Sequence, residues 1–227
     1  MERLEDRLAA IERLLRDPPA VHLDAPGQVW STSPECYRFI ARFCPPGTRT
    51  LETGCGVSTI LFAIWGAEHR CVVPVAREAI RSVGYIAERM IDYRPPRIEV
   101  GFSSEVLPSL EVGELDLYLI DGGHAFPDPA IDWFYGARWL RRGGVLVIDD
   151  AQLPAVKQLT WFLDRDPRWT SIADTRKWVA YERAGEGALA EPWTKQWFFR
   201  SPASVLDTSK ERIRGMAGRA YRSVFRR

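Results

Sequence analysis

TLETGCGVSTI, residues 50–60, places two glycines two positions apart, after a short apolar approach and before an apolar run. The residues before the glycines predict a strand, and the run after them predicts a helix. Because glycine has no side chain, such a loop lets a ligand come close to the backbone. The stretch therefore predicts a strand, a ligand-binding loop and a helix, in that order.

The residues after Gly56 bear on two phosphate-binding motifs. The dinucleotide motif GxGxxG requires glycine or alanine three positions later, where this chain has the bulky, β-branched Thr59. A Walker A loop ends in Gly-Lys-Ser or Gly-Lys-Thr, which this sequence lacks. A nicotinamide-dependent oxidoreductase is therefore disfavoured, and the loop suits a ligand without phosphate.

Strand and helix signals alternate along the rest of the chain. Seven segments are predicted as strands: residues 48–53, 70–75, 97–102, 115–122, 144–150, 169–175 and 177–184. Helical patterns between most of them imply right-handed βαβ crossovers. The sequence thus predicts an α/β fold with a doubly wound, mostly parallel, seven-stranded sheet and added N-terminal helices. Such sheets bind ligands beyond the carboxyl ends of the strands, where the strand order reverses.

The composition limits the partners and the location. The chain has 227 residues, 46% of them hydrophobic, with 31 basic and 30 acidic side chains and a formal net charge of +1. This length suits one main domain, and the balanced charge gives no support for nucleic-acid binding. The N-terminus lacks the apolar core of a signal peptide, and no apolar run is long enough to span a bilayer. We expect a cytoplasmic protein with reduced thiols.

Changes in pattern divide the chain into four segments: residues 1–17, 18–33, 34–208 and 209–227. The first is an amphipathic helix with one apolar stripe, which either packs on the domain or forms a homodimer contact. A linker containing proline and glycine follows, and then the main domain. The last segment is basic, and is either a helix that binds an anionic surface or a solvated tail.

The glycine loop fits a more specific pattern, in which a strand ends in the acid Glu52 and is followed by Gly-x-Gly-x-Ser. This pattern resembles motif I of the class I S-adenosylmethionine-dependent methyltransferases, whose cofactor has no phosphate. In that family the glycines let the backbone approach the cofactor, and the acid lies by its methionyl end. The resemblance implies a Rossmann-like methyltransferase fold and the cofactor-binding residues Glu52, Thr53, Gly54, Gly56 and Ser58.

Two later stretches extend this resemblance. RIEVGFSSEVLPSL, residues 97–110, is similar to the region after the third strand of catechol-type O-methyltransferases, which implies that Ser103 lies near the adenine. LYLIDGGHAF, residues 117–126, and LRRGGVLVIDD, residues 140–150, are similar to the fourth and fifth strands, which implies that Asp121 also contacts the cofactor. The resemblance covers about residues 30–184 and is closest to small O-methyltransferases, including those that act on sugars and antibiotic intermediates.

The chain departs from the family at the end of the second strand. The family has an acid there that holds the ribose hydroxyls, whereas this chain has Pro74 and no acid before Glu78. Either Glu78 reaches the ribose from the following helix, or the contact is missing. A missing contact would suit a methyltransferase-fold protein that binds cofactor or ligand without turnover.

Three carboxylates are expected together at the carboxyl edge of the sheet. Asp121 ends the fourth predicted strand, and Asp149 and Asp150 end the fifth. Hard oxygen ligands suit Mg²⁺, and acids at these places hold Mg²⁺ in the metal-dependent catechol-type enzymes. The alternative is that these side chains order the turns that follow the strands. The resemblance thus implies a magnesium site made by Asp121, Asp149 and Asp150.

His124 lies three residues past Asp121, where the resembling enzymes carry their lysine base. We therefore expect His124 and Asp121 to be the catalytic residues, with His124 as general base. The expected activity is O-methylation of a hydroxyl on a sugar, natural product or phenol, driven by the histidine, by Mg²⁺ or by both. Trp30 is the best candidate for the wall of the acceptor pocket, and the sequence does not name the acceptor.

Overall fold

The computed structural model describes residues 3–22, 31–89 and 91–185 of the chain. The strands in these ranges are β1 (Arg49–Thr53), β2 (Glu68–Val73), β3 (Arg97–Val100), β4 (Leu115–Ile120), β5 (Leu140–Ile148), β6 (Trp169–Asp174) and β7 (Val179–Arg183). The α-helices are α1 (Leu4–Arg16), α2 (Pro34–Phe43), α3 (Val57–Ile64), α4 (Ala76–Glu88), α5 (Ser103–Val106), α6 (Asp128–Gly136) and α7 (Pro154–Leu163). Trp30, the end of the predicted domain and the basic segment 209–227 lie outside the described residues.

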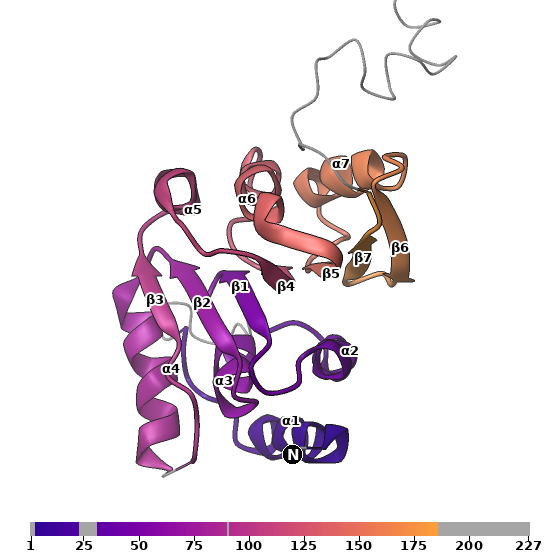
Figure 1. Cartoon of the computed structure of the whole chain (residues 1–227). Helices are drawn as coiled ribbons and strands as arrows, with labels where there is room; N and C mark the ends of the chain where they lie inside the picture. The colour runs from indigo at the N-terminus through magenta and orange to yellow at the C-terminus, as the bar shows by residue number, and fades with distance from the viewer. Residues whose placement is uncertain (1–2, 23–30, 90, 186–227) are drawn as a thin grey trace, which may run out of the picture. The chain divides into compact units, whose positions relative to one another are not determined.

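The strands form one sheet in the order β3-β2-β1-β4-β5-β7-β6 (Figure 1). The pairs from β3 to β5 are parallel, and β7 lies antiparallel between β5 and β6. This confirms the predicted seven-stranded, mostly parallel sheet. The strand order reverses between β1 and β4, so the glycine loop after β1 lies at the point where open α/β sheets bind ligands.

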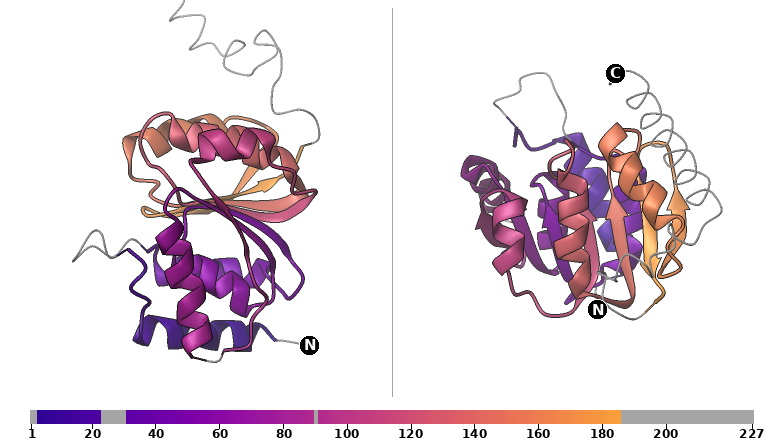
Figure 2. Two further views of the ribbon diagram at one scale, coloured as in Figure 1. Left: turned by 90° about the vertical axis from the view of Figure 1, so that its left-hand side faces the viewer. Right: turned by 90° about the horizontal axis from the view of Figure 1, so that it is seen from above.

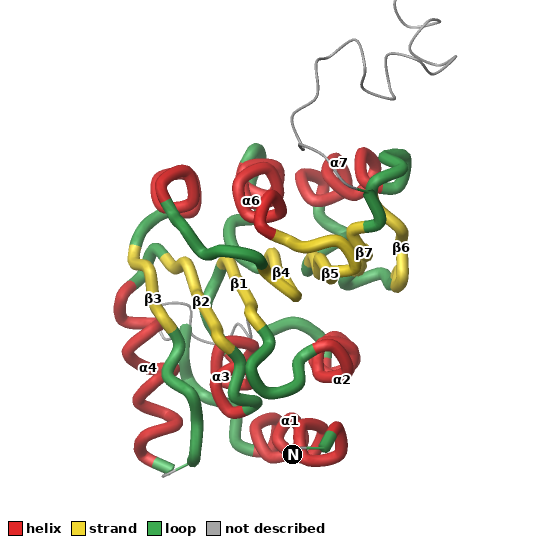
Figure 3. The backbone as a smooth tube through the Cα atoms, in the orientation of Figure 1, coloured by secondary structure: helices red, strands yellow, loops and turns green. Residues whose placement is uncertain are grey.

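Helices cover both faces of the sheet (Figures 1 and 3). Helices α2, α3 and α4 lie on one face, and α5, α6 and α7 lie on the other (Figure 2). The middle strands are therefore buried on both sides, which explains the nearly continuous apolar run of β4. Within the described part of the chain, no helix is long and apolar enough to cross a membrane.

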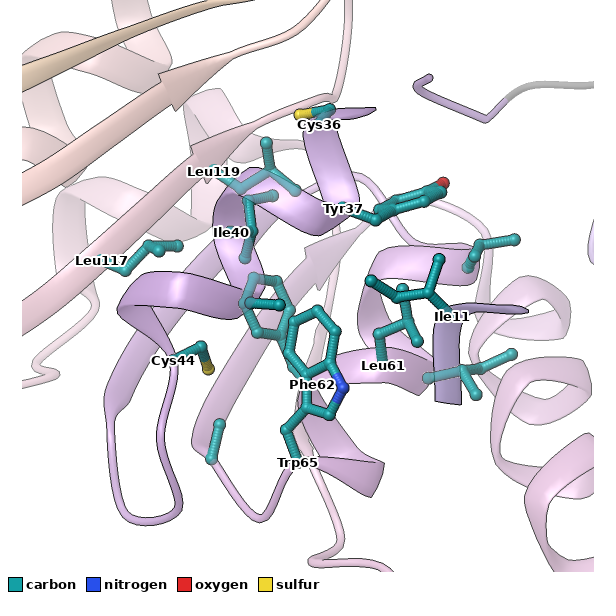
Figure 4. Packing of buried hydrophobic residues seen from close by; sticks show 14 of the residues in the cluster. Ile11, Cys36, Tyr37, Ile40, Cys44, Leu61, Phe62, Trp65, Leu117 and Leu119 are labelled. Atoms are coloured by element: carbon teal, nitrogen blue, oxygen red, sulfur yellow. The ribbon is translucent and has the colours of Figure 1, made fainter. Parts of the chain in front are cut away.

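The main hydrophobic core lies between the sheet and the helices α1, α2 and α3 (Figure 4). Leu117 and Leu119 of β4 face Ile40 of α2, while Phe62 and Trp65 fill the space below. Each of these side chains is at most 1% exposed. Full burial of a large apolar side chain stabilises a fold by about 1.5–3 kcal/mol, so this core holds β4 and β5 against the helices α1, α2 and α3.

Helix α1 packs against α2 and α3 of the same chain. Ala10, Ile11 and Leu14 are buried in the core, and Nε of Arg7 donates to the carbonyl oxygen of Ala41 at 2.9 Å. The amphipathic helix is thus present, and its apolar residues pack as in the intramolecular alternative. A homodimer through this helix stays a prediction.

Candidate active site

A cavity of about 610 Å³ opens at the carboxyl ends of β1, β4 and β5. Its walls include residues 54–58 from the glycine loop and residues 121–124 from the loop after β4. Asp149 and Asp150, after β5, complete this side of the wall. The volume lies in the range of small-molecule sites, about 300–1,000 Å³. The fold therefore brings most of the predicted site residues to one place.

At Gly54 the loop after β1 packs closely against the loop after β4. Its φ is +97°, and a Cβ added there would lie 2.1 Å from the carbonyl oxygen of Asp121. Its N–H donates to the carbonyl oxygen of Val72 at 2.9 Å. Only glycine meets both requirements, because other residues rarely adopt this φ and the space is filled by backbone.

Gly56 has a different role, because its backbone is extended with a φ of 177°. A Cβ at this position would lie 3.5 Å from Nε2 of His22, which is an ordinary contact. Gly56, Val57 and Ser58 line the cavity at the start of α3. The free backbone N–H groups of a helix start favour an anionic ligand group such as a carboxylate.

Glu52 lies inside the protein and is not among the residues that line the cavity. Its carboxylate accepts hydrogen bonds from the hydroxyls of Ser58 and Thr59, and Nε2 of His69 lies 3.2 Å away. Nδ1 of His69 lies 2.8 Å from the hydroxyl oxygen of Thr50. We call these five residues the interior cluster. Glu52 thus stabilises the first turn of α3 from the interior of the protein. Any effect of Glu52 on the cofactor would therefore pass through the position of this helix.

Thr53 and Ser103 lie beside Asp132 of α6 rather than on the cavity wall. Burial raises the pKa of the Asp132 carboxyl from 3.8 to about 6, and the hydroxyls of Ser103 and Thr53 act in the opposite direction. Asp132 is 0% exposed. The sequence does not distinguish this acid, because it lies in a helix of mixed apolar and acidic residues.

Glu78 lies on the cavity wall close to the end of β2. It is in the first turn of α4, and its Oε1 lies 2.9 Å from Nδ1 of His22. Glu78, His22 and Pro74 all line the cavity. The sequence left two alternatives: Glu78 reaches the ribose from the helix after the second strand, or the contact is missing. The position of Glu78 on the cavity wall favours the first.

A second group of charged side chains, the cavity cluster, consists of Asp121, His124, Asp149, Asp150 and Lys177, all of which line the cavity. Nε2 of His124 lies 3.0 Å from Oδ2 of Asp150. Nζ of Lys177 lies 2.5 Å from Oδ1 of Asp150 and 3.1 Å from Oδ2 of Asp149. Sequence reasoning missed Lys177, which reaches the site from the turn between β6 and β7.

Charges within the cavity cluster shift the pKa values of its members. Burial raises the pKa of the Asp121 carboxyl, and the nearby Asp149 carboxylate raises it further. Burial acts to raise the pKa of Asp150, but the hydrogen bond from Lys177 outweighs it and lowers that pKa. Burial acts to lower the pKa of Lys177, but Asp150 and Asp149 leave it raised. The Lys177–Asp150 pair is therefore charged at neutral pH.

The backbone at Asp150 has a positive φ of 52°. A residue other than glycine in this region costs about 1–3 kcal/mol, and such residues gather at functional sites. Two contacts hold it in place: Nε2 of Gln152 donates to its Oδ1 at 2.7 Å, and the next residue, Ala151, donates its N–H to the carbonyl oxygen of Lys177 at 2.9 Å.

The three aspartates predicted to bind magnesium do not fit that site as they stand. Oδ1 of Asp149 accepts a hydrogen bond from the hydroxyl of Thr32 at 2.6 Å, and its Oδ2 faces the Lys177 ammonium group. Among the described residues, two groups have metal-binding spacing: the buried Glu52, His69 and Cys71, and, at the cavity, Asp121, His124 and Asp150. Mg²⁺ prefers oxygen ligands at about 2.0–2.1 Å. Here the Lys177 ammonium group already contacts one carboxylate oxygen of Asp149 and one of Asp150. Magnesium binding stays an untested prediction.

Comparisons with known proteins bear on the domain and the fold. Residues 51–151 match the family model described as a methyltransferase domain. Cofactor-bound Rv0187 from MTB is similar in structure, with a TM-score of 0.58 and 20% identity over 81% of this chain and 90% of that one. The O-methyltransferase TomG from Streptomyces achromogenes, in complex with SAM, has a TM-score of 0.56 and 18% identity over 82% and 91% of the two chains. No curated protein sequence matches the chain.

The O-methyltransferase from Bacillus cereus, in complex with SAH, is a third similar structure. It has a TM-score of 0.56 and 15% identity, over 77% of this chain and 90% of that one. At these identities the structures establish the fold alone. Residues 51–151 thus match a methyltransferase domain, and the similar structures share the fold of this chain.

Proposed function

We propose that the protein transfers the methyl group of S-adenosylmethionine to a hydroxyl oxygen of a small molecule. The observation that supports this most strongly is that the glycine loop after β1 and the His124–Asp150 pair line the same cavity. The loop suits the methyl donor, and the pair suits the removal of a proton from the acceptor. A sugar, a natural product or a phenol would offer such a hydroxyl.

The methionyl end of the cofactor is assigned to residues 54–58. The backbone N–H groups at the start of α3 are donors for its carboxylate, and Glu52 supports this helix start through Ser58. The ribose is assigned to Glu78, because a carboxylate on the cavity wall can accept hydrogen bonds from two hydroxyls. Contact of the adenine with Ser103, at the start of α5, stays a prediction, because Ser103 does not line the cavity.

The acceptor proton is assigned to Nδ1 of His124. Because Nε2 lies against Asp150, a neutral ring carries its proton on Nε2 and leaves Nδ1 able to accept another. The acceptor oxygen attacks the methyl carbon of the sulfonium as its proton passes to Nδ1. The carbon–sulfur bond breaks, its electron pair stays on sulfur, and a methyl ether and S-adenosylhomocysteine result. Asp150 stabilises the imidazolium ion that forms.

A binding protein without turnover is the second candidate, and Pro74 at the end of β2 is the observation that favours it. The position of Glu78 weakens this candidate, because an acid is present on the cavity wall near the same strand end. The two candidates differ in one measurable property: the enzyme leaves a methyl group on an acceptor, and the binding protein does not.

Calorimetry with S-adenosylmethionine and with NAD tests the ligand class. We expect S-adenosylmethionine to bind and NAD not to bind; tight binding of NAD alone would overturn the proposal. Incubation with methyl-labelled cofactor and a panel of phenols, sugars and hydroxylated natural products then tests turnover. Label transfer to at least one hydroxyl supports the enzyme, and cofactor binding with no transfer across the panel supports the binding protein.

A further inference from the structure

We propose that the Lys177 ammonium group takes the place of a divalent cation in the acceptor site, so that this methyltransferase works without a metal. The inference deepens the proposed function and rests on it for the identity of the reaction. Its structural part, exclusion of a metal by Lys177, does not depend on turnover and can be tested separately.

The position of Lys177 is set by its backbone as well as by its side chain. It lies in the turn between β6 and β7, and its carbonyl oxygen accepts a hydrogen bond from Ala151 at 2.9 Å. Within that turn, Thr175 donates its N–H to the carbonyl oxygen of Trp178 at 3.0 Å. The hydrogen bond from Ala151 therefore connects this turn to the residues after β5, and it places Lys177 next to the two aspartates that follow that strand.

Of the three aspartates predicted to bind a metal, Asp149 and Asp150 already have partners for their carboxylate oxygens. One oxygen of Asp149 accepts from Thr32 at 2.6 Å, and the other lies 3.1 Å from the ammonium nitrogen. One oxygen of Asp150 lies 2.5 Å from the same nitrogen, and the other lies 3.0 Å from Nε2 of His124. A divalent cation on these oxygens would stand within a few ångströms of a positive charge, which repels it.

The ammonium group can also do what a metal would do for the acceptor. It has three N–H donors, and the contacts with Asp149 and Asp150 use two of them. Lys177 lines the cavity, so the third donor can bind the acceptor oxygen and stabilise the negative charge that develops as its proton leaves. His124, on the other side of Asp150, accepts that proton. Lys177 thus orients the acceptor, and His124 provides the base.

Titration of the full-length protein with Mn²⁺, followed by electron paramagnetic resonance, tests the exclusion of a metal. Mn²⁺ serves as a probe because it accepts the same oxygen ligands as Mg²⁺ and can be detected directly. We expect wild type to bind no Mn²⁺ above background, and Lys177→Ala to bind it at least tenfold more tightly. Lys157→Ala removes an exposed lysine of α7 and is the matched control, expected to behave as wild type.

Two further variants separate charge from folding. Lys177→Arg keeps the positive charge and should still exclude Mn²⁺, whereas Lys177→Met fills the space without charge and should admit it if Lys177→Ala does not fold. The proposal is overturned if wild type binds Mn²⁺ as tightly as the neutral variants, or if the neutral variants bind none. The Mn²⁺ titration needs neither an acceptor nor S-adenosylmethionine. The proposed function is tested separately, because it would be overturned by a failure to bind S-adenosylmethionine.

A second readout applies once an acceptor is identified. Turnover by wild type should be unchanged after treatment with EDTA and after addition of Mg²⁺. If EDTA abolished turnover and added Mg²⁺ restored it, a metal would have the role that is assigned here to Lys177, and the proposal would be overturned.

Discussion

Two clusters in the protein pair a histidine with a carboxylate, and they differ in their access to a ligand. In the interior cluster, the side chains of His69 and Glu52 are 0% and 1% exposed. In the cavity cluster, those of His124 and Asp150 are 20% and 18% exposed. The residue types are the same, but only the second pair lies where a substrate can reach it. Access, rather than residue type, separates a structural pair from a candidate catalytic one.

The backbone explains this difference. Parallel pairing places Thr50 beside His69 within the sheet, two residues before Glu52, so the interior cluster is enclosed beneath α3. His124 and Asp150 follow the ends of β4 and β5, where loops project beyond the strands into the cavity. The interior carboxylate is satisfied by donors of the protein itself, whereas the cavity cluster is open to groups of a ligand.

Replacing Gly54, which lines the cavity, should have the largest effect. Gly54→Ala would put a Cβ 2.1 Å from the Asp121 carbonyl oxygen at a φ of +97°. The loops after β1 and β4 would have to separate, and we expect no measurable binding of S-adenosylmethionine by calorimetry. Gly56→Ala is the matched control, with a milder loss, because its backbone is extended. Equal losses in both variants would contradict this account of the loop.

Replacing the histidine of the cavity cluster should affect chemistry and leave stability unchanged. His124→Ala is expected to lower kcat by about 10²–10⁴-fold, the usual contribution of a general base. The melting temperature and the affinity for S-adenosylmethionine should stay close to wild type. His124→Gln preserves size and hydrogen bonding but cannot accept the proton, so it should be equally slow. Wild-type kcat in either variant would remove His124 from the mechanism.

Replacing the carboxylate of the interior cluster should have the opposite pattern. Glu52→Leu leaves the donors of Ser58, Thr59 and His69 without their acceptor, and each unpaired buried group costs about 1–3 kcal/mol. We expect a loss of about 3 kcal/mol or more in the free energy of unfolding, measured in urea. The folded fraction should still bind S-adenosylmethionine, although more weakly because the start of α3 loses its support, since Glu52 does not line the cavity. A stable variant that has lost the cofactor would place Glu52 in direct contact with it.

Asp132, a third buried acid, tests whether burial raises the pKa of a carboxyl group in this protein. Its pKa is raised from 3.8 to about 6 in the folded protein. A raised pKa stabilises the fold below pH 4, and this contribution is lost as the pH rises through 6. Since each pKa unit is worth about 1.4 kcal/mol, the loss is at most about 3 kcal/mol. The melting temperature of Asp132→Asn relative to wild type should therefore rise between pH 4 and pH 7. A difference that does not change with pH would contradict the raised pKa.

The smallest expected effect concerns Glu78, which lies on the cavity wall. Glu78→Gln keeps the shape but weakens hydrogen bonds from ribose hydroxyls, so we expect the Kd for S-adenosylmethionine to rise about tenfold, or about 1.4 kcal/mol. The value of kcat at saturating cofactor should not change, because Glu78 is assigned to binding. An unchanged Kd would mean that the ribose is held elsewhere.

The sequence by itself determined the fold and the edge of the sheet that carries the site. Alternating strand and helix patterns require a parallel sheet, and the carboxyl ends of parallel strands meet at one edge. Gly54 and His124 therefore had to lie near each other, although 69 residues lie between them. The apolar stripe of α1 likewise predicted a helix, but its spacing could not distinguish packing within the chain from packing between two copies.

Only the tertiary structure decided which side chains face the ligand and which face the interior. β1 is covered on both sides, so the position of Glu52 in the sequence could not indicate the side on which its carboxylate lies. Lys177 meets Asp150 from 27 residues further along the chain. This meeting depends on the antiparallel pairing of β7 with β5. Local patterns reflect the period of each element, whereas contacts between elements depend on register and on the course of the turns, which are fixed only when the whole sheet forms.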